Sequence, residues 1–238
     1  MFASILVATF NQGRYLGQCI ESLAGQTVPR SEYEIVVVND GSTDGTADVL
    51  DGYAGGVDAI ITHEVCQGLV AACNSGLKGC RGDYIIRVDS DDWLHPASID
   101  RLQNAANANP AADIITPAYW IVEHDGTHVL HTDAANMFTW MAGGALLRRS
   151  AVARAGNYRD FYWEEYDLYL RMLAGGAKAV ELPLPVLYHR EHQASMTARK
   201  ETRAAGWTQL IGAWPKETLL AYGHHEELSE LLSPGARL

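Results

Sequence analysis

Apolar runs alternate with segments of helical spacing through the first hundred residues. The runs are short and nearly continuous, as expected for strands that are covered on both faces, and they predict strands at 4–9, 34–39, 58–63 and 84–88. In the segments between them, apolar residues recur at i, i+3, i+4 and i+7, as at Leu16, Cys19, Ile20 and Leu23. This order predicts an α/β fold with a mostly parallel central sheet flanked by helices.

The pattern changes after Asn109-Pro110. Alternating segments at 113–123 and 127–131 indicate two paired strands around a turn, and a helical stripe predicts a helix at 164–174. Two further short strands are expected at 177–182 and 186–190. We therefore divide the chain into one domain at 1–197, with halves at 1–96 and 97–197, and a helical C-terminal extension at 198–238.

The C-terminal extension carries an apolar stripe. Trp207, Leu210, Ile211 and Trp214 share one helical face, and basic residues stand nearby. The stripe could pack on the domain, pair two subunits or touch a membrane surface, and we favour packing or pairing.

Composition limits the function classes. The apolar content of 47% supports a sizeable core, and the formal charge of −11 argues against a nucleic-acid partner. No apolar run reaches the roughly 18 residues of a membrane span, and the N-terminus has no targeting signal. The four cysteines contain no CxxC pair, so we interpret them as small core residues of a protein in a reduced, cytoplasmic compartment. Peripheral contact with the inner face of the membrane is left open.

Polar residues follow three of the predicted strands, where open α/β sheets bind ligands. Ala8-Thr9-Phe10-Asn11 leaves the first strand, and Phe10 offers either a flat face for a base or an aromatic that packs at the strand end. Asp40 leaves the second strand at a glycine-rich turn. Its carboxylate suits a base N–H or a ribose hydroxyl, although DGS is also a common turn.

The third of these polar segments follows the predicted strand at 84–88 and is rich in carboxylates. In Asp89-Ser90-Asp91-Asp92, extended geometry would place Asp89 and Asp91 on one side, where they suit a hard cation such as Mg²⁺ or Mn²⁺. A solvated acidic turn is the alternative. A calcium loop is excluded because Trp93 and Leu94 stand where an oxygen ligand and a glycine are required, and a phosphatase of the haloacid-dehalogenase type fits the motif's position poorly.

Six motifs in order carry a family resemblance. They are TFN, VNDGSTDGT, GLVAACNSG, GDYIIRVDSDDWLHP, GGALLRRSAVARAGNY and WEEYDLYLRM. Together they resemble the family 2 glycosyltransferases of GT-A fold, most closely over 3–96. The resemblance implies a nucleotide-diphosphate-sugar donor, usually a UDP-sugar, with Mn²⁺ or Mg²⁺ as cofactor.

The resemblance also implies residue roles. Asp91, Asp89 and His192 would hold the metal. The nucleotide-sugar-binding residues would be Ala8, Thr9, Phe10, Asn11, Asp40, Gly68, Asp89, Ser90 and Arg190.

An acidic pair at the start of a helix supplies the general base in this family. Glu164 and Glu165 occupy that place, and Glu165 matches the position that is usually Asp. The alternative is an acidic first turn favoured by the helix dipole. We interpret Asp167 and Arg171 as an i, i+4 ion pair.

Three positions depart from the family pattern. Ala8, Cys66 and Cys73 stand where the family often has Pro, Asn and a basic residue. The leading hypothesis is a metal-dependent inverting glycosyltransferase acting on a saccharide or lipid-linked acceptor in surface polysaccharide or glycolipid synthesis. The alternative is a catalytically silent nucleotide-sugar-binding or partner module.

Overall fold

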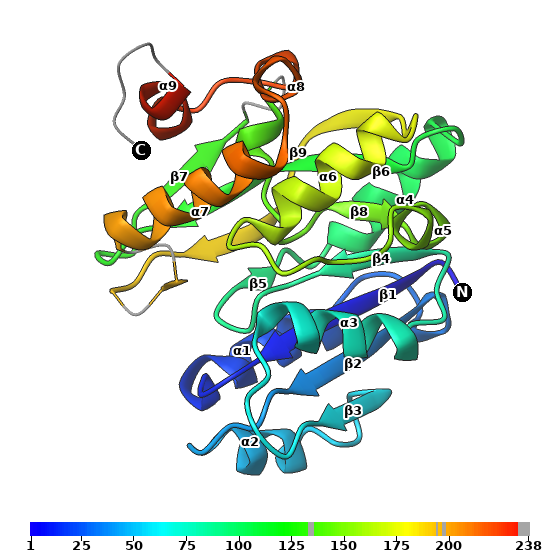
Figure 1. Ribbon diagram of the computed structural model, residues 1–238. Helices are drawn as coiled ribbons and strands as arrows, with labels where there is room; N and C mark the ends of the chain where they lie inside the picture. The colour runs from blue at the N-terminus through cyan, green and yellow to red at the C-terminus, as the bar shows by residue number, and fades with distance from the viewer. Residues whose placement is uncertain (133–135, 194, 197–198, 233–238) are drawn as a thin grey trace.

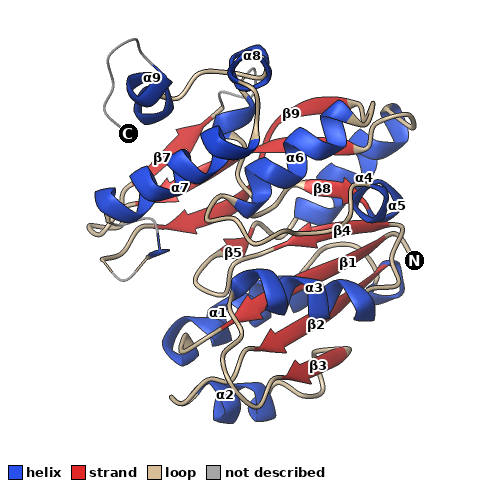
Figure 2. Cartoon of the chain, viewed as in Figure 1, coloured by secondary structure: helices blue, strands red, loops and turns tan. Residues whose placement is uncertain are grey.

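The computed structural model describes residues 1–132, 136–193, 195–196 and 199–232. Within these residues the strands form one nine-stranded sheet in the order β3-β2-β1-β4-β8-β6-β9-β5, with β7 paired to β6 (Figures 1 and 2). The strands are β1 (Ala3–Thr9), β2 (Tyr33–Asn39), β3 (Ala59–Thr62), β4 (Tyr84–Arg87), β5 (Trp93–Leu94), β6 (Ile114–Val122), β7 (His128–His131), β8 (Leu146–Arg148) and β9 (Ala179–Arg190).

Helices connect and cover these strands. The α-helices are α1 (Gly13–Ala24), α2 (Thr46–Gly52), α3 (Leu69–Gly79), α4 (Ser98–Ala108), α5 (Arg149–Arg154), α6 (Glu164–Ala174), α7 (Lys200–Ala213), α8 (Lys216–Ala221) and α9 (Glu226–Leu232). Two short 3₁₀ helices, η1 and η2, span Arg30–Glu32 and Met137–Thr139.

The sheet is mostly parallel, as predicted. β3, β2, β1 and β4 are paired in parallel, β6 and β9 run in the same direction as these four, and β8, β5 and β7 run the other way. Thr9 pairs with Asn39, and Asn39 with Thr62. The carboxyl ends of the first strands therefore meet at one edge, where the polar segments of the sequence also gather.

Each face of the sheet has its own core because strand residues alternate between the faces. Leu6 and Val38 point toward α3, α6 and α7, whereas Ile5 and Val37 point toward α1 and α4. α3 lies so close to the sheet that a Cβ on Gly76 would stand 2.1 Å from Leu6 Cδ1. Two buried layers thus fix the strand ends from both sides.

The second half of the sheet is less regular. The predicted pair of strands around Asp125-Gly126 is confirmed as antiparallel β6 and β7. The two short strands predicted at 177–182 and 186–190 are wrong, because β9 is one strand of twelve residues. Its pairing with β6 shifts register beside Pro183 and Pro185, so the prolines mark an irregularity within the strand rather than its end.

The C-terminal helices pack on the domain. Trp207 and Leu210 are fully buried, and Ile211 and Trp214 pack partly buried against the same core. Trp207 Nε1 also donates to Glu227 at 3.0 Å, which ties α7 to α9. Packing thus accounts for this stripe, and the proposed domain boundary at 197 lies outside the described residues.

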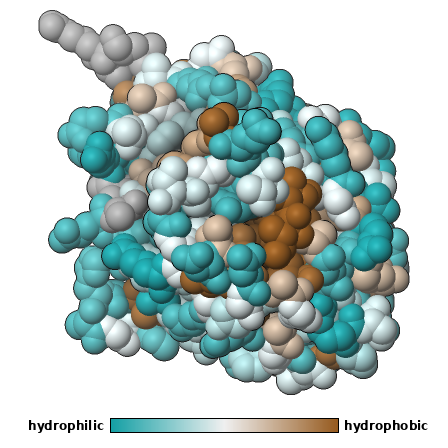
Figure 3. Space-filling model, turned by 90° about the horizontal axis from the view of Figure 1, so that it is seen from below, coloured by the Kyte–Doolittle hydropathy of each residue, from teal (hydrophilic) through white to brown (hydrophobic). Residues whose placement is uncertain are grey.

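The edge strand β3 presents apolar side chains on one surface. Ile60 of β3 is 39% exposed, and Figure 3 shows a brown patch on the side of the molecule where β3 lies. No helix in the described ranges is long and apolar enough to cross a membrane.

Candidate active site

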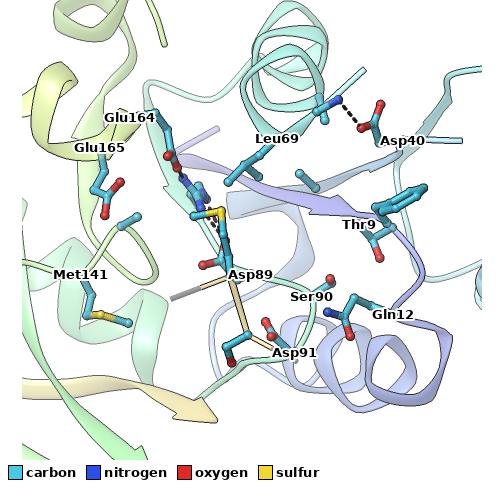
Figure 4. Close-up of a pocket in the computed structure, with 18 of the residues that line it drawn as sticks. Thr9, Gln12, Asp40, Leu69, Asp89, Ser90, Asp91, Met141, Glu164 and Glu165 are labelled. Carbon is cyan, nitrogen blue, oxygen red and sulfur yellow. Dashed lines mark hydrogen bonds and ion pairs between the residues drawn. The ribbon is translucent and has the colours of Figure 1, made fainter. Parts of the chain in front are cut away.

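A cavity opens at the carboxyl edge of the parallel strands. It encloses about 540 Å³ and is bounded by the ends of β1 and β4, the start of α3, the first turn of α6 and the segment after η2 (Figure 4). Nine of the predicted site residues line it, namely Ala8, Thr9, Phe10, Asp40, Gly68, Asp89, Ser90, Asp91 and Glu165. Asn11, Arg190 and His192 are not among its lining residues.

Asp40 holds the loop before α3 against the end of β2. Its carboxylate accepts hydrogen bonds from the backbone N–H groups of Gln67 (2.9 Å) and Gly68 (2.8 Å) and from the Cys66 thiol (3.2 Å), and it pairs with His63 Nδ1 at 2.6 Å. Burial acts to raise the pKa of Asp40, but these donors outweigh it and lower the pKa below its usual value. These four partners occupy the acceptor sites of the Asp40 carboxylate in the structure. The proposed hydrogen bond from Asp40 to a nucleotide base stays a prediction.

Asn11 organises the neighbouring loop. It has a positive φ of 53°, and its side-chain oxygen accepts from the backbone N–H of Thr43 at 2.8 Å and of Asp44 at 3.3 Å. The glycine-rich turn is thereby fastened to the end of β1. The proposed ligand contact of Asn11 is not tested by this geometry.

Asp89 and Glu164 share one buried arginine. Arg87, 5% exposed, donates to Asp89 Oδ1 through Nε at 2.9 Å and pairs with Glu164 Oε1 through Nη1 at 2.5 Å. An unpaired charge at this depth would be costly, so each member of the group depends on the others.

Asp91 and Asp92 have separate histidine partners. Asp91 Oδ2 lies 2.8 Å from His192 Nε2. Asp92 is fully buried, lies 3.1 Å from His189 Nδ1 and accepts from the Arg190 backbone N–H at 2.9 Å. Burial raises the pKa of Asp92 although the charge of His189 opposes it. The acidic tip is thus joined to β9 and the loop that follows it, and it is not a solvated turn.

Arg190 lies outside the cavity. Its guanidinium is stacked between the rings of Tyr15 and Trp93, at 4.8 and 4.6 Å from their centroids. It also donates to the Asp91 carbonyl at 3.0 Å and to Gln18 at 2.6 Å. These contacts hold the acidic tip against α1, and the proposed phosphate contact of Arg190 stays a prediction.

Asp91 and His192, which we call the metal corner, offer suitable donor atoms for a metal ion but not a complete set of ligands. No group of three or more His, Cys, Asp or Glu side chains among the described residues could hold a metal ion. Asp91 and His192 nevertheless bring an oxygen and a nitrogen together, and the buried His192 Nδ1 has no hydrogen-bond partner within the described ranges. Two protein donors are enough for Mn²⁺ or Mg²⁺ when substrate phosphates and water supply the rest. The residues present therefore fit such an ion.

Glu165 differs from the other acids of the site. No other residue in the described part of the chain hydrogen-bonds to its side chain or forms an ion pair with it. Figure 4 shows its carboxylate pointing into the cavity, apart from Glu164. Surrounding protein raises the pKa of Glu165, and the negative charge of Glu164 raises it further. A carboxylate with a raised pKa is a stronger proton acceptor than an ordinary glutamate, as a general base requires.

The sequence model described as "Glycosyl transferase family 2" matches residues 4–167. The chain belongs to this family.

Curated relatives include glycosyltransferases of bacteria and of an archaeon. The putative glycosyltransferase EpsH of Bacillus subtilis is 30% identical over 190 residues, covering 79% of this chain and 52% of EpsH. A poly(ribitol-phosphate) beta-glucosyltransferase of Bacillus spizizenii is 33% identical over 112 residues, covering 46% of this chain and 18% of that protein. The chain therefore spans about half, or less, of the curated relatives it matches.

Solved structures share the fold. TarS of S. aureus, solved with UDP-GlcNAc, has a TM-score of 0.74 at 18% identity, over 93% of this chain and 71% of that one. The mannosyltransferase PcManGT of Pyrobaculum calidifontis, solved with GDP-Man and Mn²⁺, has a TM-score of 0.70 at 18% identity, over 92% and 68%. These similarities confirm the GT-A fold expected from the motifs.

The cysteine interpretation needs one correction. Cys19, Cys73 and Cys80 are buried as expected, but Cys66 is exposed and lines the cavity. It precedes α3 in a loop held by Asp40, so hydrogen bonds to that carboxylate from the Cys66 thiol and the Gln67 backbone N–H, rather than burial, set its place.

Sequence reasoning missed the apolar wall of the cavity and its buried arginine. Arg87 interrupts an otherwise apolar strand, and that signal could have identified it because a buried charge needs a partner. The wall had no comparable signal, since its members are ordinary core residues by type and come from separate segments. They include Trp140, Met141, Ala142, Trp163, Tyr166 and Met196.

Proposed function

We propose that this chain is a metal-dependent, inverting glycosyltransferase that transfers a sugar from a nucleoside-diphosphate sugar to an acceptor hydroxyl. The observation that carries the proposal is the arrangement of one cavity. Asp91, which is paired with His192, lies at its strand-end side, and Glu165, which has no partner in the described part of the chain, lines it from α6. Family membership and the fold shared with TarS and PcManGT support the same reaction class.

The donor would enter along the strand ends. Ala8, Thr9 and Phe10 would border the nucleotide, with Gly68 and the Asp40-held loop forming the opposite wall. Asp89 and Ser90 would face the ribose. Asp91 and His192 would hold Mn²⁺ or Mg²⁺, which when bound stabilises the negative charge of the departing nucleoside diphosphate. A UDP-sugar is our first choice of donor.

Glu165 would act as the general base. It would take the proton of the acceptor hydroxyl as that oxygen forms a bond to the anomeric carbon. The bond from the anomeric carbon to the diphosphate oxygen would break with its electron pair leaving on the diphosphate. A single displacement of this kind inverts the anomeric configuration.

The acceptor would approach over the apolar wall. Trp140, Met141 and Met196 border the cavity beside the first turn of α6. Relatives include poly(ribitol-phosphate) glycosyltransferases, which supports a surface polymer or its lipid-linked precursor as the acceptor. Placement in the cytoplasm, with peripheral contact at the membrane, is part of the same proposal.

A panel of nucleotide sugars tests the proposal. The protein is incubated with UDP-, GDP- and dTDP-sugars, with Mn²⁺ or with a chelator, and the released nucleoside diphosphate is measured. We expect slow hydrolysis of one donor class that requires the metal. Metal-dependent binding without hydrolysis or transfer would instead support the silent binding module, and no binding of any donor would contradict both.

A further inference from the structure

Arg87 has an unusual position for a charged residue. It is the last residue of β4, in the middle of the sheet, and only 5% of its surface is exposed. Its guanidinium lies over the ring of Tyr158, 6.0 Å from the centroid, and is bound by two carboxylates. Nε and Nη2 lie 2.9 and 2.8 Å from Asp89 Oδ1, and Nη1 lies 2.5 Å from Glu164 Oε1.

The two carboxylates belong to different parts of the site. Asp89 begins the acidic tip, two residues before Asp91, whereas Glu164 is the first residue of α6 and is 2% exposed. Both acids are labelled in Figure 4, and both accept hydrogen bonds from the Arg87 guanidinium. One planar guanidinium therefore spans the space between the strand end and the helix start, which a lysine ammonium could not do in the same way.

Glu164 also precedes the proposed base in the chain. Because the backbone of Glu164 and Glu165 is continuous within the first helical turn, fixing the Glu164 carboxylate restrains the direction in which Glu165 points. Small displacements of a reacting group can cost about 100-fold in rate, so this restraint bears on the chemistry.

We propose that Arg87 is a positioning residue that couples the donor end of the cavity to the base end by holding Asp89 and Glu164 together. The inference rests on the proposed function and deepens it. Arg87 does not touch the reacting atoms in this scheme. It sets the relative placement of the acidic tip and of the helix turn that carries Glu165.

The test compares three variants. Arg87→Lys keeps the charge but loses the fork that reaches both acids. Glu164→Gln keeps an acceptor for Arg87 and removes the charge only at the base end. Arg148→Lys is the matched control, because Arg148 pairs with Asp113 at 3.1 Å and lies opposite Tyr84, at the other end of β4.

Two quantities are measured for each variant. One is the dissociation constant of UDP or GDP, whichever binds more tightly with Mn²⁺, and the other is kcat for donor hydrolysis. We expect Arg87→Lys to weaken nucleotide binding by about 3- to 10-fold and to lower kcat by about 10- to 100-fold. Glu164→Gln should lower kcat by about 10-fold with unchanged nucleotide binding, and Arg148→Lys should change neither.

Other results would overturn the proposal. The proposal fails if Arg87→Lys lowers the melting temperature but leaves nucleotide binding and kcat at their wild-type values. Arg87→Lys would then behave like the control Arg148→Lys. If Arg87→Lys does not fold, Glu164→Gln decides, and an unchanged kcat in that variant contradicts the coupling. If the wild type hydrolyses no donor, the proposed function fails, and the effect of Arg87→Lys on Mn²⁺-dependent nucleotide binding still tests the coupling at the donor end.

Discussion

Two acidic regions border the cavity, and they use their carboxylates differently. In the tip at 89–92, every carboxylate has a basic partner: Asp89 has Arg87, Asp91 has His192, and Asp92 has His189. In the first turn of α6, Glu164 and Asp167 are also paired, but Glu165 has no such partner among the residues that the structure describes.

Pairing is thus a guide to role. A carboxylate that already accepts from a buried arginine or histidine holds its surroundings in place and is poorly suited to take a substrate proton. A carboxylate that faces a cavity without a partner is available for that step. The contrast supports Glu165 rather than Glu164 as the proposed base, the same choice that the family motif favours.

Replacing the unpaired acid should have the largest effect. Glu165→Gln removes the proposed proton acceptor, and we expect kcat for transfer or hydrolysis to fall by about 10²- to 10⁴-fold with nucleotide binding retained. Steady-state kinetics and calorimetric titration measure the two quantities. Glu217→Gln on the exposed side of α8 is the control, and a kcat near the wild-type value in Glu165→Gln would remove Glu165 from the mechanism.

Replacing a paired acid of the same turn should affect stability instead. Asp167 is buried and accepts from Arg159 and Arg171, and Trp214 Nε1 donates to it at 3.1 Å. Asp167→Asn leaves these partners without a counter-charge, and we expect a loss of about 3 kcal/mol in the free energy of unfolding. Urea unfolding measures this loss, and kcat of the folded variant should be unchanged.

The contacts of Asp167 with its two arginines also predict that the stability of the protein depends on pH. Burial acts to raise the pKa of Asp167, but its arginine and tryptophan partners lower it below the usual value. The ionised group therefore stabilises the protein above the ordinary carboxyl range, and that contribution is lost as pH falls through the lowered pKa. The difference between wild type and Asp167→Asn should shrink in acid, and a constant difference would contradict the ion-pair account.

The pKa of Glu165 is raised, whereas that of Asp167 is lowered, and the raised pKa predicts how the rate depends on pH. Because the pKa of Glu165 is raised, the base becomes ionised only at higher pH than an ordinary glutamate. The rate should rise as pH increases through that raised pKa and fall about 10-fold per unit below it. A pH–rate profile of donor hydrolysis checks this, and an acid limb at an ordinary or lower carboxyl value would be inconsistent with it.

The smallest of these effects belongs to the metal corner. His192→Ala removes one of the proposed metal donors while Asp91 remains, and we expect the Mn²⁺ dependence of nucleotide binding to weaken by about 10-fold. Titration of Mn²⁺ at fixed nucleotide measures it, with the exposed His124→Ala as control. Unchanged Mn²⁺ dependence would assign His192 to the structural pairing with Asp91 alone.

The two halves of the chain also differ in how far sequence patterns predicted them. The parallel strands of the first half were predicted closely because continuous apolar runs and helical spacing are local signals. β8 and the single long β9 were not, since three-residue pairing and a proline-bearing irregularity are set by neighbouring strands.

The same distinction applies to the site. The strand-end acids and Glu165 stand in motifs whose spacing is visible in the sequence, and the cavity brings most of them together. Arg190 packs between Tyr15 and Trp93, which are far from it in the chain, so no local pattern could reveal this contact. The place of Arg87 in an apolar strand signals that it needs a partner, but no local pattern could identify Glu164, 77 residues away, as that partner.

The central claim is that this cavity binds a nucleoside-diphosphate sugar through a divalent ion held at Asp91. Calorimetric titration of UDP and GDP into the wild type and Asp91→Asn, with and without Mn²⁺, tests it most directly. The account predicts that Mn²⁺ tightens binding of one nucleotide by at least about 10-fold in the wild type and not in Asp91→Asn. Equal affinity with and without the metal in the wild type, or equal tightening in both proteins, would contradict it.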